Sequence, residues 1–139
     1  MRFMIIVKAN QDSEAGTLPS DAELAAMTTY NEELVKAGVM LAGEGLHPSA
    51  KGARVRFGEG KQRTVIDGPF SEAKELVAGF WLWQCKSRDE AIEWLKRAPF
   101  QAGAEVELRP VFEITDFVDA SPETLKRNDD LREQVSQRS

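Results

Sequence analysis

Residues 79–85 read Gly-Phe-Trp-Leu-Trp-Gln-Cys, a run of strand-forming residues that is too short for a helix. In an extended chain Phe80 and Leu82 point to one side, and Trp81 and Trp83 point to the other. Both sides are apolar, so the pattern predicts a strand that is covered on both faces. Since one layer of helices covers only one face of a sheet, we expect a second copy of the chain to cover the other. The run therefore predicts a homodimer.

The preceding stretch, residues 65–75, reads Val-Ile-Asp-Gly-Pro-Phe-Ser-Glu-Ala-Lys-Glu. Gly68 permits unusual dihedral angles and Pro69 restricts both itself and its neighbour, so regular strand pairing is expected to stop there. Asp67 would then sit at a strand end. Its carboxylate has two interpretations: it either closes an Asx-turn or faces a cleft as a general acid or base.

Hydrophobic periodicity and capping signals predict the remaining elements. A strand is expected at Arg2–Val7, followed by a loop at Lys8–Pro19 that overhangs a pocket. Ser20 and Glu23 form a capping-box pair that begins a helix ending before Gly38. The later elements are a glycine-interrupted apolar strand at 39–46, a hairpin at 53–57 and 62–66, a helix at 87–98 that starts with a second capping box formed by Ser87 and Glu90, and a strand at 104–114 that Pro110 interrupts.

This order predicts an α+β fold, a ferredoxin-like unit with an antiparallel sheet and two helices. We expect one domain at residues 1–116. Residues 117–139 are richer in charge and contain a helix start at Ser121-Pro122-Glu123, so they are expected to form a helical C-terminal extension.

Composition narrows the classes of function. The chain has 139 residues and a net charge of −5, which argues against nucleic-acid binding because phosphate contacts require clustered basic residues. The sequence shows neither a membrane span nor a secretory signal, so a cytoplasmic location is expected. Cys85 is the sole cysteine and His47 the sole histidine, so we expect neither a metal site nor a cofactor.

The candidate site residues follow from their chemistry. Histidine is the side chain whose unperturbed pKa lies near neutrality, so His47 is a candidate for proton transfer together with Asp67, although a lone loop histidine also occurs simply as a surface residue. Arg54 or Arg109 is expected to bind an anion, and Phe70 to contact a ligand.

The run Asp67-Gly68-Pro69-Phe70, followed by residues 71–75 and 79–82, resembles the DGPF-type proteins of the YCII-related family. The strand at 2–7, the stretch Gly43-Glu44-Gly45-Leu46 and the run at 106–111 extend the resemblance to about residues 1–115. The resemblance implies a homodimer with a dimeric α/β-barrel fold. It also implies a cleft for small-molecule chemistry of the isomerase, dehydrochlorinase-like or oxygenase kind. The His-Asp pair of some members cannot be matched residue by residue to His47.

Two classes of function remain open. The first is an enzyme that acts on a small anionic or aromatic metabolite by acid/base chemistry near Asp67. The second is a non-catalytic metabolite-binding or regulatory module, which the resemblance links to extracytoplasmic-function sigma factors. A polar cleft that contains an acid of raised pKa favours the enzyme, whereas a cleft walled only by apolar groups favours the binding module.

Overall fold

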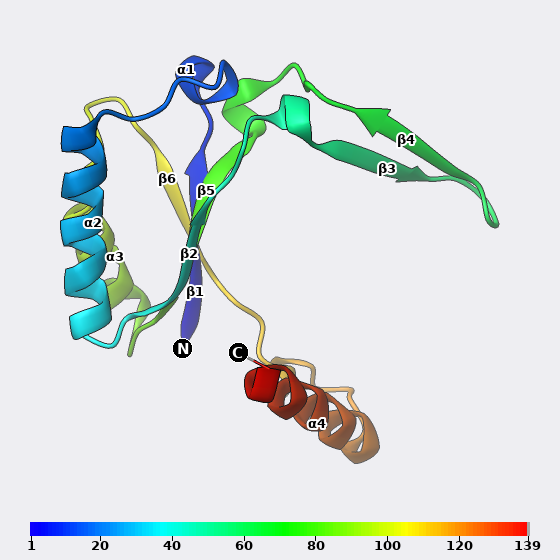
Figure 1. Ribbon diagram of the computed structural model, residues 1–139. Helices are drawn as coiled ribbons and strands as arrows, with labels where there is room; N and C mark the ends of the chain where they lie inside the picture. Colours follow the sequence, from blue (N-terminus) through cyan, green and yellow to red (C-terminus); the bar gives the residue numbers. More distant parts are fainter. Residues whose placement is uncertain (139) are drawn as a thin grey trace.

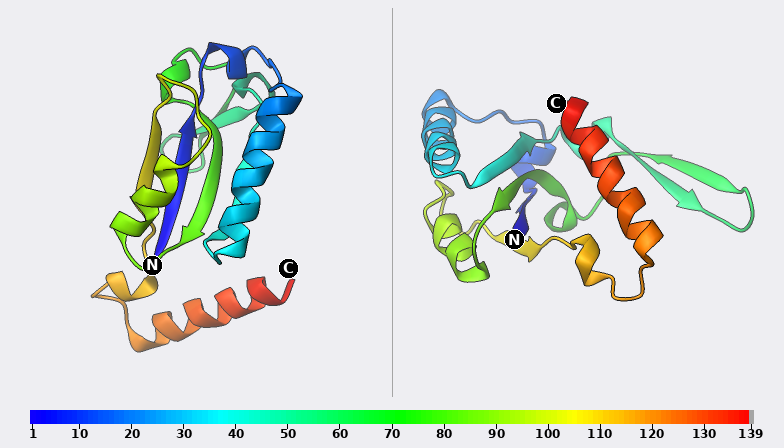
Figure 2. Two further views of the ribbon diagram at one scale, coloured as in Figure 1. Left: turned by 90° about the vertical axis from the view of Figure 1, so that its left-hand side faces the viewer. Right: turned by 90° about the horizontal axis from the view of Figure 1, so that it is seen from below.

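The computed structural model describes residues 1–138 and is built around a four-stranded antiparallel sheet with the strand order β2-β5-β1-β6. Helices α2 (Asp21–Lys36) and α3 (Arg88–Lys96) lie side by side on one face of this sheet (Figures 1 and 2). The chain order β1-α2-β2-β5-α3-β6 with this strand order is the ferredoxin-like arrangement, which confirms the predicted fold class. The strands are β1 (Arg2–Lys8), β2 (Met40–Gly45), β5 (Val77–Gln84) and β6 (Val106–Pro110).

A hairpin inserted between β2 and β5 forms its own two-stranded sheet and projects away from the body of the protein (Figure 1). Its strands are β3 (Ala53–Phe57) and β4 (Arg63–Asp67), and the glycine-rich turn between them lies where the sequence predicted it. The connections are 3-10 turns, η1 (Ser49–Lys51) before the hairpin and η2 (Ala73–Glu75) after it.

The helix starts follow the capping signals. The Ser20 hydroxyl accepts a hydrogen bond from the Glu23 N–H and the Glu23 carboxylate reaches back, so this capping box is confirmed. Ser87 caps α3 through the Glu90 N–H, but the Glu90 carboxylate accepts from the Lys86 N–H, so the second predicted capping box is only half formed. The segment at 8–19 is not wholly a loop, because a third cap that sequence reasoning missed, Asn10 with Ser13, begins the short helix α1 (Gln11–Glu14).

The core lies between the sheet and the two helices. Phe3, Ile5, Leu34 and Trp83 are fully buried there, with Tyr30, Trp81 and Cys85 nearly so. The buried Tyr30 hydroxyl donates to the Trp94 carbonyl oxygen at 2.6 Å, so its polar end is satisfied. Burial raises the pKa of the Cys85 thiol, which therefore stays protonated at neutral pH.

The two faces of the sheet differ in cover. The expected second copy was to cover one apolar side of the strand at residues 79–85. Trp81 and Trp83 are covered by the chain's own helices, so exposure of these two rings is not what calls for a second copy. The uncovered groups are Phe80 and Leu82, which stay half-buried, and Met4, which is 36% exposed. A strand with two apolar sides therefore has only one of them covered within a single chain. We call this uncovered side the open sheet face.

The C-terminal part ends in helix α4 (Pro122–Arg138), which has no buried residue and lies apart from the two packed helices (Figure 2). It is preceded by the 3-10 turn η3 (Ile114–Asp116). The last strand ends at Pro110, where the sequence predicted an interruption, and the Val111 N–H still donates to the Arg2 carbonyl oxygen at 2.9 Å. The division between a domain at 1–116 and an extension stays a prediction. No described helix is both long and apolar enough to span a membrane.

Candidate functional site

A cavity of about 400 Å³ lies at the base of the hairpin, where four strand ends meet. We call it the hairpin-base cavity. Residues that follow β2 form one wall, the start of β3 and the turn after β4 form a second, and the residues that lead into β5 close the third. The lining residues are Glu14, Leu46, His47, Pro48, Ser49, Lys51, Gly52, Arg54, Phe70, Leu76 and Val77.

Gly68 holds the Asp67–Phe70 segment against η1. A Cβ atom at this position would lie 1.8 Å from the Ser49 carbonyl oxygen, so no other residue type fits without movement of the backbone. The Gly68 N–H donates to the Gly52 carbonyl oxygen at 3.0 Å, and the Gly68-Pro69 peptide bond is cis. The reason for glycine here is therefore close approach. Gly68 is not among the positive-φ glycines, so a left-handed backbone is not what requires glycine here.

Ser49 links three segments that are distant in sequence. Its hydroxyl donates to the Glu14 carboxylate at 2.5 Å and accepts from the Phe70 N–H at 3.0 Å, while its own N–H donates to Glu14 at 2.9 Å. These two donors lower the pKa of Glu14, because a carboxylate that accepts hydrogen bonds is favoured in its charged form. Glu14 therefore contributes a fixed negative charge at one end of the cavity.

The cavity lining also contains basic and aromatic side chains. The Arg54 guanidinium lies over the Phe70 ring, 3.8 Å from its centroid. Lys51 and His47 line the same space. Stacking on the ring holds the Arg54 side chain in place while leaving its N–H donors free for a carboxylate or phosphate. Chemically, the basic side chains can hold an anion, the ring can contact a flat ligand, and His47 can exchange a proton with it.

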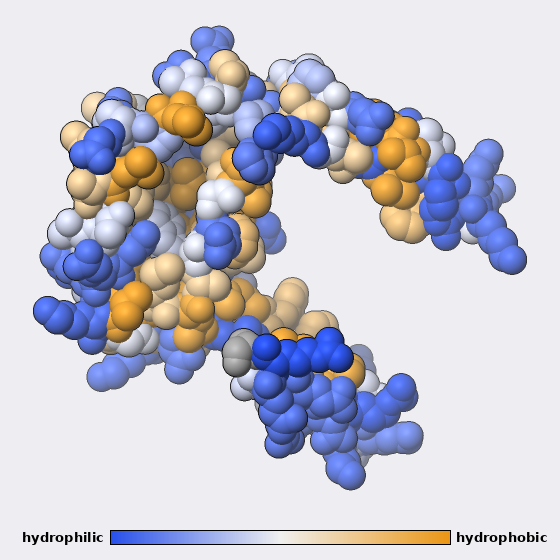
Figure 3. Space-filling view, viewed as in Figure 1, coloured by the Kyte–Doolittle hydropathy of each residue, from blue (hydrophilic) through white to orange (hydrophobic). Residues whose placement is uncertain are grey.

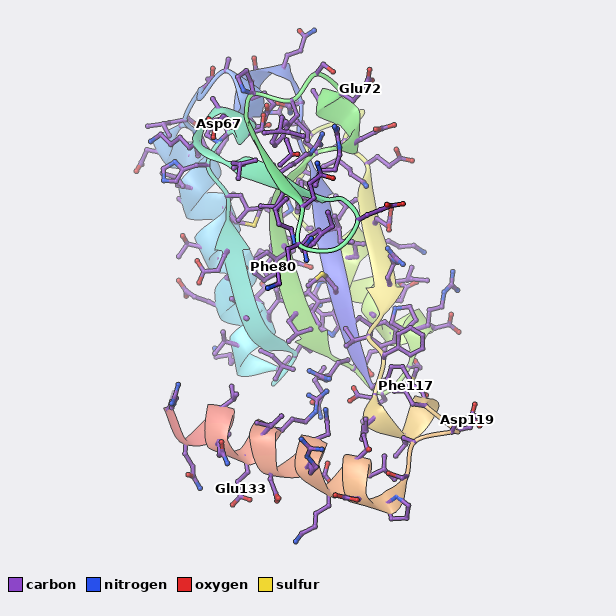
Figure 4. The ribbon with its side chains drawn as sticks, turned by 90° about the vertical axis from the view of Figure 1, so that its right-hand side faces the viewer. Asp67, Glu72, Phe80, Phe117, Asp119 and Glu133 are labelled. Carbon is purple, nitrogen blue, oxygen red and sulfur yellow. The ribbon has the colours of Figure 1, made fainter. Side chains whose placement is uncertain are left out.

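The structure gathers three of the five site residues proposed from the sequence, namely His47, Arg54 and Phe70. Arg109 is elsewhere: it pairs in register with Met4 on the open sheet face and lies 3.7 Å from the Glu107 carboxylate. Asp67 is exposed at the end of β4, in the register position opposite Ala53, and does not line the hairpin-base cavity. Figure 4 shows it at the foot of the hairpin.

No described residue forms a hydrogen bond or ion pair with the Asp67 carboxylate, so it does not close an Asx-turn. Alternation along β4 places its side chain on the opposite side of the hairpin from Ile66, which is the register partner of Arg54. Its catalytic role stays a prediction.

Sequence reasoning missed Glu14, Ser49 and Lys51. Glu14 could have been found from the capping signal at Asn10. That signal predicts a short helix within residues 8–19, and Glu14, at the end of this helix, lines the cavity. Ser49 and Lys51 follow a proline in a stretch without periodicity, so only the folded chain shows that they meet Glu14 and Phe70.

A second, smaller cavity of about 230 Å³ lies between α2 and strands β2 and β5, with mostly apolar walls that include Met27 and Phe100. Asn31 contributes a polar group, because its amide oxygen accepts from the Trp81 indole N–H at 2.9 Å. A Cβ atom at Gly43 would lie 2.6 Å from the Trp81 ring, so the bare backbone makes room for that ring. Asn31 was visible in the sequence as the polar member of an apolar stripe, between Met27 and Leu34.

Within residues 1–138, no group of three or more His, Cys, Asp or Glu side chains is placed to hold a metal ion. The expectation that the chain uses neither metal nor cofactor stays a prediction.

The amino-acid sequence of the chain matches the model of a known protein family. The model of the YCII-related domain matches residues 1–115, which is most of the chain and includes every residue of the hairpin-base cavity. The chain belongs to the YCII-related family. Membership confirms the resemblance seen in the sequence.

Two individual proteins are similar to this member of the YCII-related family. The uncharacterized protein R00369 of Rhizobium meliloti (strain 1021) is 34% identical over 70 residues, an alignment that covers 50% of this chain and 56% of that protein. The match thus spans about half the length of that relative. A solved structure of 5-chloro-2-hydroxyhydroquinone dehydrochlorinase (TftG) from Burkholderia phenoliruptrix AC1100, in complex with 2,5-dihydroxybenzoquinone, has a TM-score of 0.40 and 23% identity; the match covers 81% of this chain and 96% of that one.

Proposed function

We propose that this YCII-related protein binds a small anionic metabolite in the hairpin-base cavity and that His47 moves a proton on it. The observation that carries the proposal is the convergence of His47, Lys51, Arg54 and Phe70 on one cavity. At neutral pH, Lys51 and Arg54 contribute two positive charges and Glu14 contributes one negative charge, so the balance favours an anion.

The division of roles follows from the contacts. Arg54 is held over Phe70 and binds the anionic group of the ligand, and the Phe70 ring contacts its planar part. Glu14 is occupied by its two bonds from Ser49, so it shapes the cavity and is not the proton carrier. Histidine is the residue type whose unperturbed pKa lies near neutrality, so His47 is the cavity residue suited to proton transfer. Asp67 remains a proposed partner for it.

Calorimetric titration tests the binding step. The probes are benzoate and salicylate, with benzamide and benzyl alcohol as neutral analogues of the same size. We expect the two anions to bind and the substitution Arg54→Gln to weaken them at least tenfold. Arg56→Gln is the matched control, because Arg56 lies two residues along the same strand and does not line the cavity. Equal losses in both variants, or equal binding of neutral and charged probes, would contradict the proposal.

Proton transfer is tested separately. We expect the wild type to catalyse deuterium exchange into the acidic C–H positions of small 2-oxo acids, as seen by proton NMR, and His47→Asn to slow it by about a hundredfold. The Asp67→Asn variant shows whether that carboxylate takes part. Anion binding without any catalysed exchange in the wild type would instead support the binding or regulatory module.

We also propose that the chain is a homodimer. The support is the open sheet face, where Met4, Phe80 and Leu82 form an apolar surface without cover in one chain. Sedimentation equilibrium at micromolar concentration measures the association directly, and a stable monomer would overturn this proposal.

A further inference from the structure

The hairpin β3–β4 has no cover within its own chain. Every residue of β3 is exposed, and within β4 only Ile66 is half-buried. An isolated two-stranded hairpin is at best marginally stable in water, because it lacks a second layer on which to bury its side chains. The hydrogen bonds at Gly68 and Phe70 hold its base, but the rest extends past the sheet (Figure 1).

One side of the hairpin is apolar. The register pairs Val55 with Val65 and Phe57 with Arg63, so these side chains share one side. Val55, Phe57 and Val65 are 51%, 71% and 65% exposed. The Arg63 guanidinium lies 4.5 Å from the centre of the Phe57 ring. Figure 3 shows apolar atoms of the hairpin bordering a hollow that it shares with the open sheet face.

A second apolar surface borders the far end of the same hollow. The rings of Phe112 and Phe117 lie 5.1 Å apart between centroids and are 69% and 50% exposed. Phe112 also lines a cavity of about 350 Å³ with Pro110 and Val111. Figure 4 shows Phe117 and Asp119 at the end of the sheet opposite Asp67, with Phe80 between the two ends.

The two surfaces carry opposite charge. Residues 53–67 contain four basic and two acidic residues, a net charge of +2: Arg54, Arg56, Lys61 and Arg63 against Glu59 and Asp67. Residues 112–119 contain three acidic residues and no basic residue, a net charge of −3: Asp116, Asp119 and Glu113, the last of which pairs with Arg2. Two hairpins would therefore repel each other, whereas a hairpin and this acidic segment attract.

We propose that the hairpin of one copy docks by its Val55–Phe57–Val65 side on the segment 112–119 of a second copy. This inference rests on the homodimer proposed above. It adds a second contact between the two chains to the contact through the open sheet face. In a two-fold dimer each copy gives its hairpin and receives the other, so the contact forms twice. A stable interface uses roughly 20–30 residues a side, which the hairpin, this segment and the open sheet face supply together.

Sedimentation equilibrium of a hairpin variant tests the contact. The variant V55T/F57T/V65T keeps strand-forming residues at all three positions, while the apolar surface is lost. Val35→Thr is the control, because Val35 is a valine of similar exposure, 63%, on α2. We expect the dissociation constant of the dimer to rise at least tenfold in the hairpin variant and to be unchanged in the control. A wild-type dimer whose dissociation constant does not change in the hairpin variant would overturn the proposal and leave the homodimer standing.

Photo-crosslinking locates the contact. A benzoylphenylalanine in place of Phe57 preserves the aromatic character, and mixing isotopically light and heavy chains separates crosslinks between copies from those within one. We expect mixed-isotope crosslinks to peptides that contain residues 112–119. The proposed docking position would be overturned by crosslinks to the hairpin of the second copy, by crosslinks to any other surface of it, or by crosslinks only within one chain. Anion titration at Arg54 is read out separately, so failure here does not imply failure of the proposed function.

Discussion

Replacing Gly68 with alanine tests whether the Asp67–Phe70 segment is shaped by close approach. The new Cβ atom would lie 1.8 Å from the Ser49 carbonyl oxygen, and contacts under 3.0 Å are essentially never observed, so the two segments must separate by at least about 1.2 Å. Such a movement stretches the 3.0 Å bond from the Gly68 N–H to Gly52 and the 3.0 Å bond from the Phe70 N–H to Ser49.

The magnitude follows from these contacts. Overpacking typically costs about 1–3 kcal/mol, and each weakened hydrogen bond adds about 1 kcal/mol at most. We therefore expect Gly68→Ala to lower the free energy of unfolding by about 2–4 kcal/mol if the hairpin base unfolds with the core. If the base opens locally instead, the loss appears as faster amide exchange and the global value changes less.

Two assays separate these outcomes. Urea denaturation followed by tryptophan fluorescence reports the core, which contains Trp81 and Trp83, and hydrogen exchange by mass spectrometry reports residues 46–54 and 66–77. Gly45→Ala is the matched control, because no atom lies within 4 Å of a Cβ at that glycine. We expect the control to be unchanged or up to about 1 kcal/mol more stable. The reasoning is refuted if Gly68→Ala matches the control in both assays.

Three further predictions concern single contacts. Ser49→Ala removes the hydroxyl, the larger of the two donors that lower the pKa of Glu14, and keeps the backbone N–H. Because the stabilisation from the hydroxyl is present above the ordinary value of 4.5 and is lost as the pH falls through the folded value, we expect the stability gap between wild type and variant to be larger at pH 7 than at pH 3 in urea titrations. Cys85 is buried with a raised pKa, so a thiol-specific disulfide reagent should react slowly with the native protein and at the rate of a free thiol in denaturant; rapid native reaction would show that the thiol is accessible. Deleting residues 118–139 removes a helix with no buried residue, so the midpoint of urea unfolding should stay within experimental error, and a lost cooperative transition would contradict this.

Local signals along the chain determined the fold class. These signals act between residues that are close in sequence, so the sequence alone predicts their effects. They are the capping residues Ser20 and Ser87, the alternation around Trp81 and Trp83, and the paired strands at 53–57 and 62–66. His47, Arg54 and Phe70 were also identified by their chemistry and adjacency to strand ends.

Tertiary structure alone decided which of these residues meet. Glu14 and Ser49 lie 35 positions apart, and Ser49 and Phe70 lie 21 apart, yet one hydroxyl joins all three. The same packing makes Gly68 necessary through a contact with Ser49, and it removes Arg109 from the cavity by placing it on the open sheet face. Long-range contacts of this kind depend on how the strand ends converge in space. No local propensity encodes that convergence, because it results from the burial of the whole core.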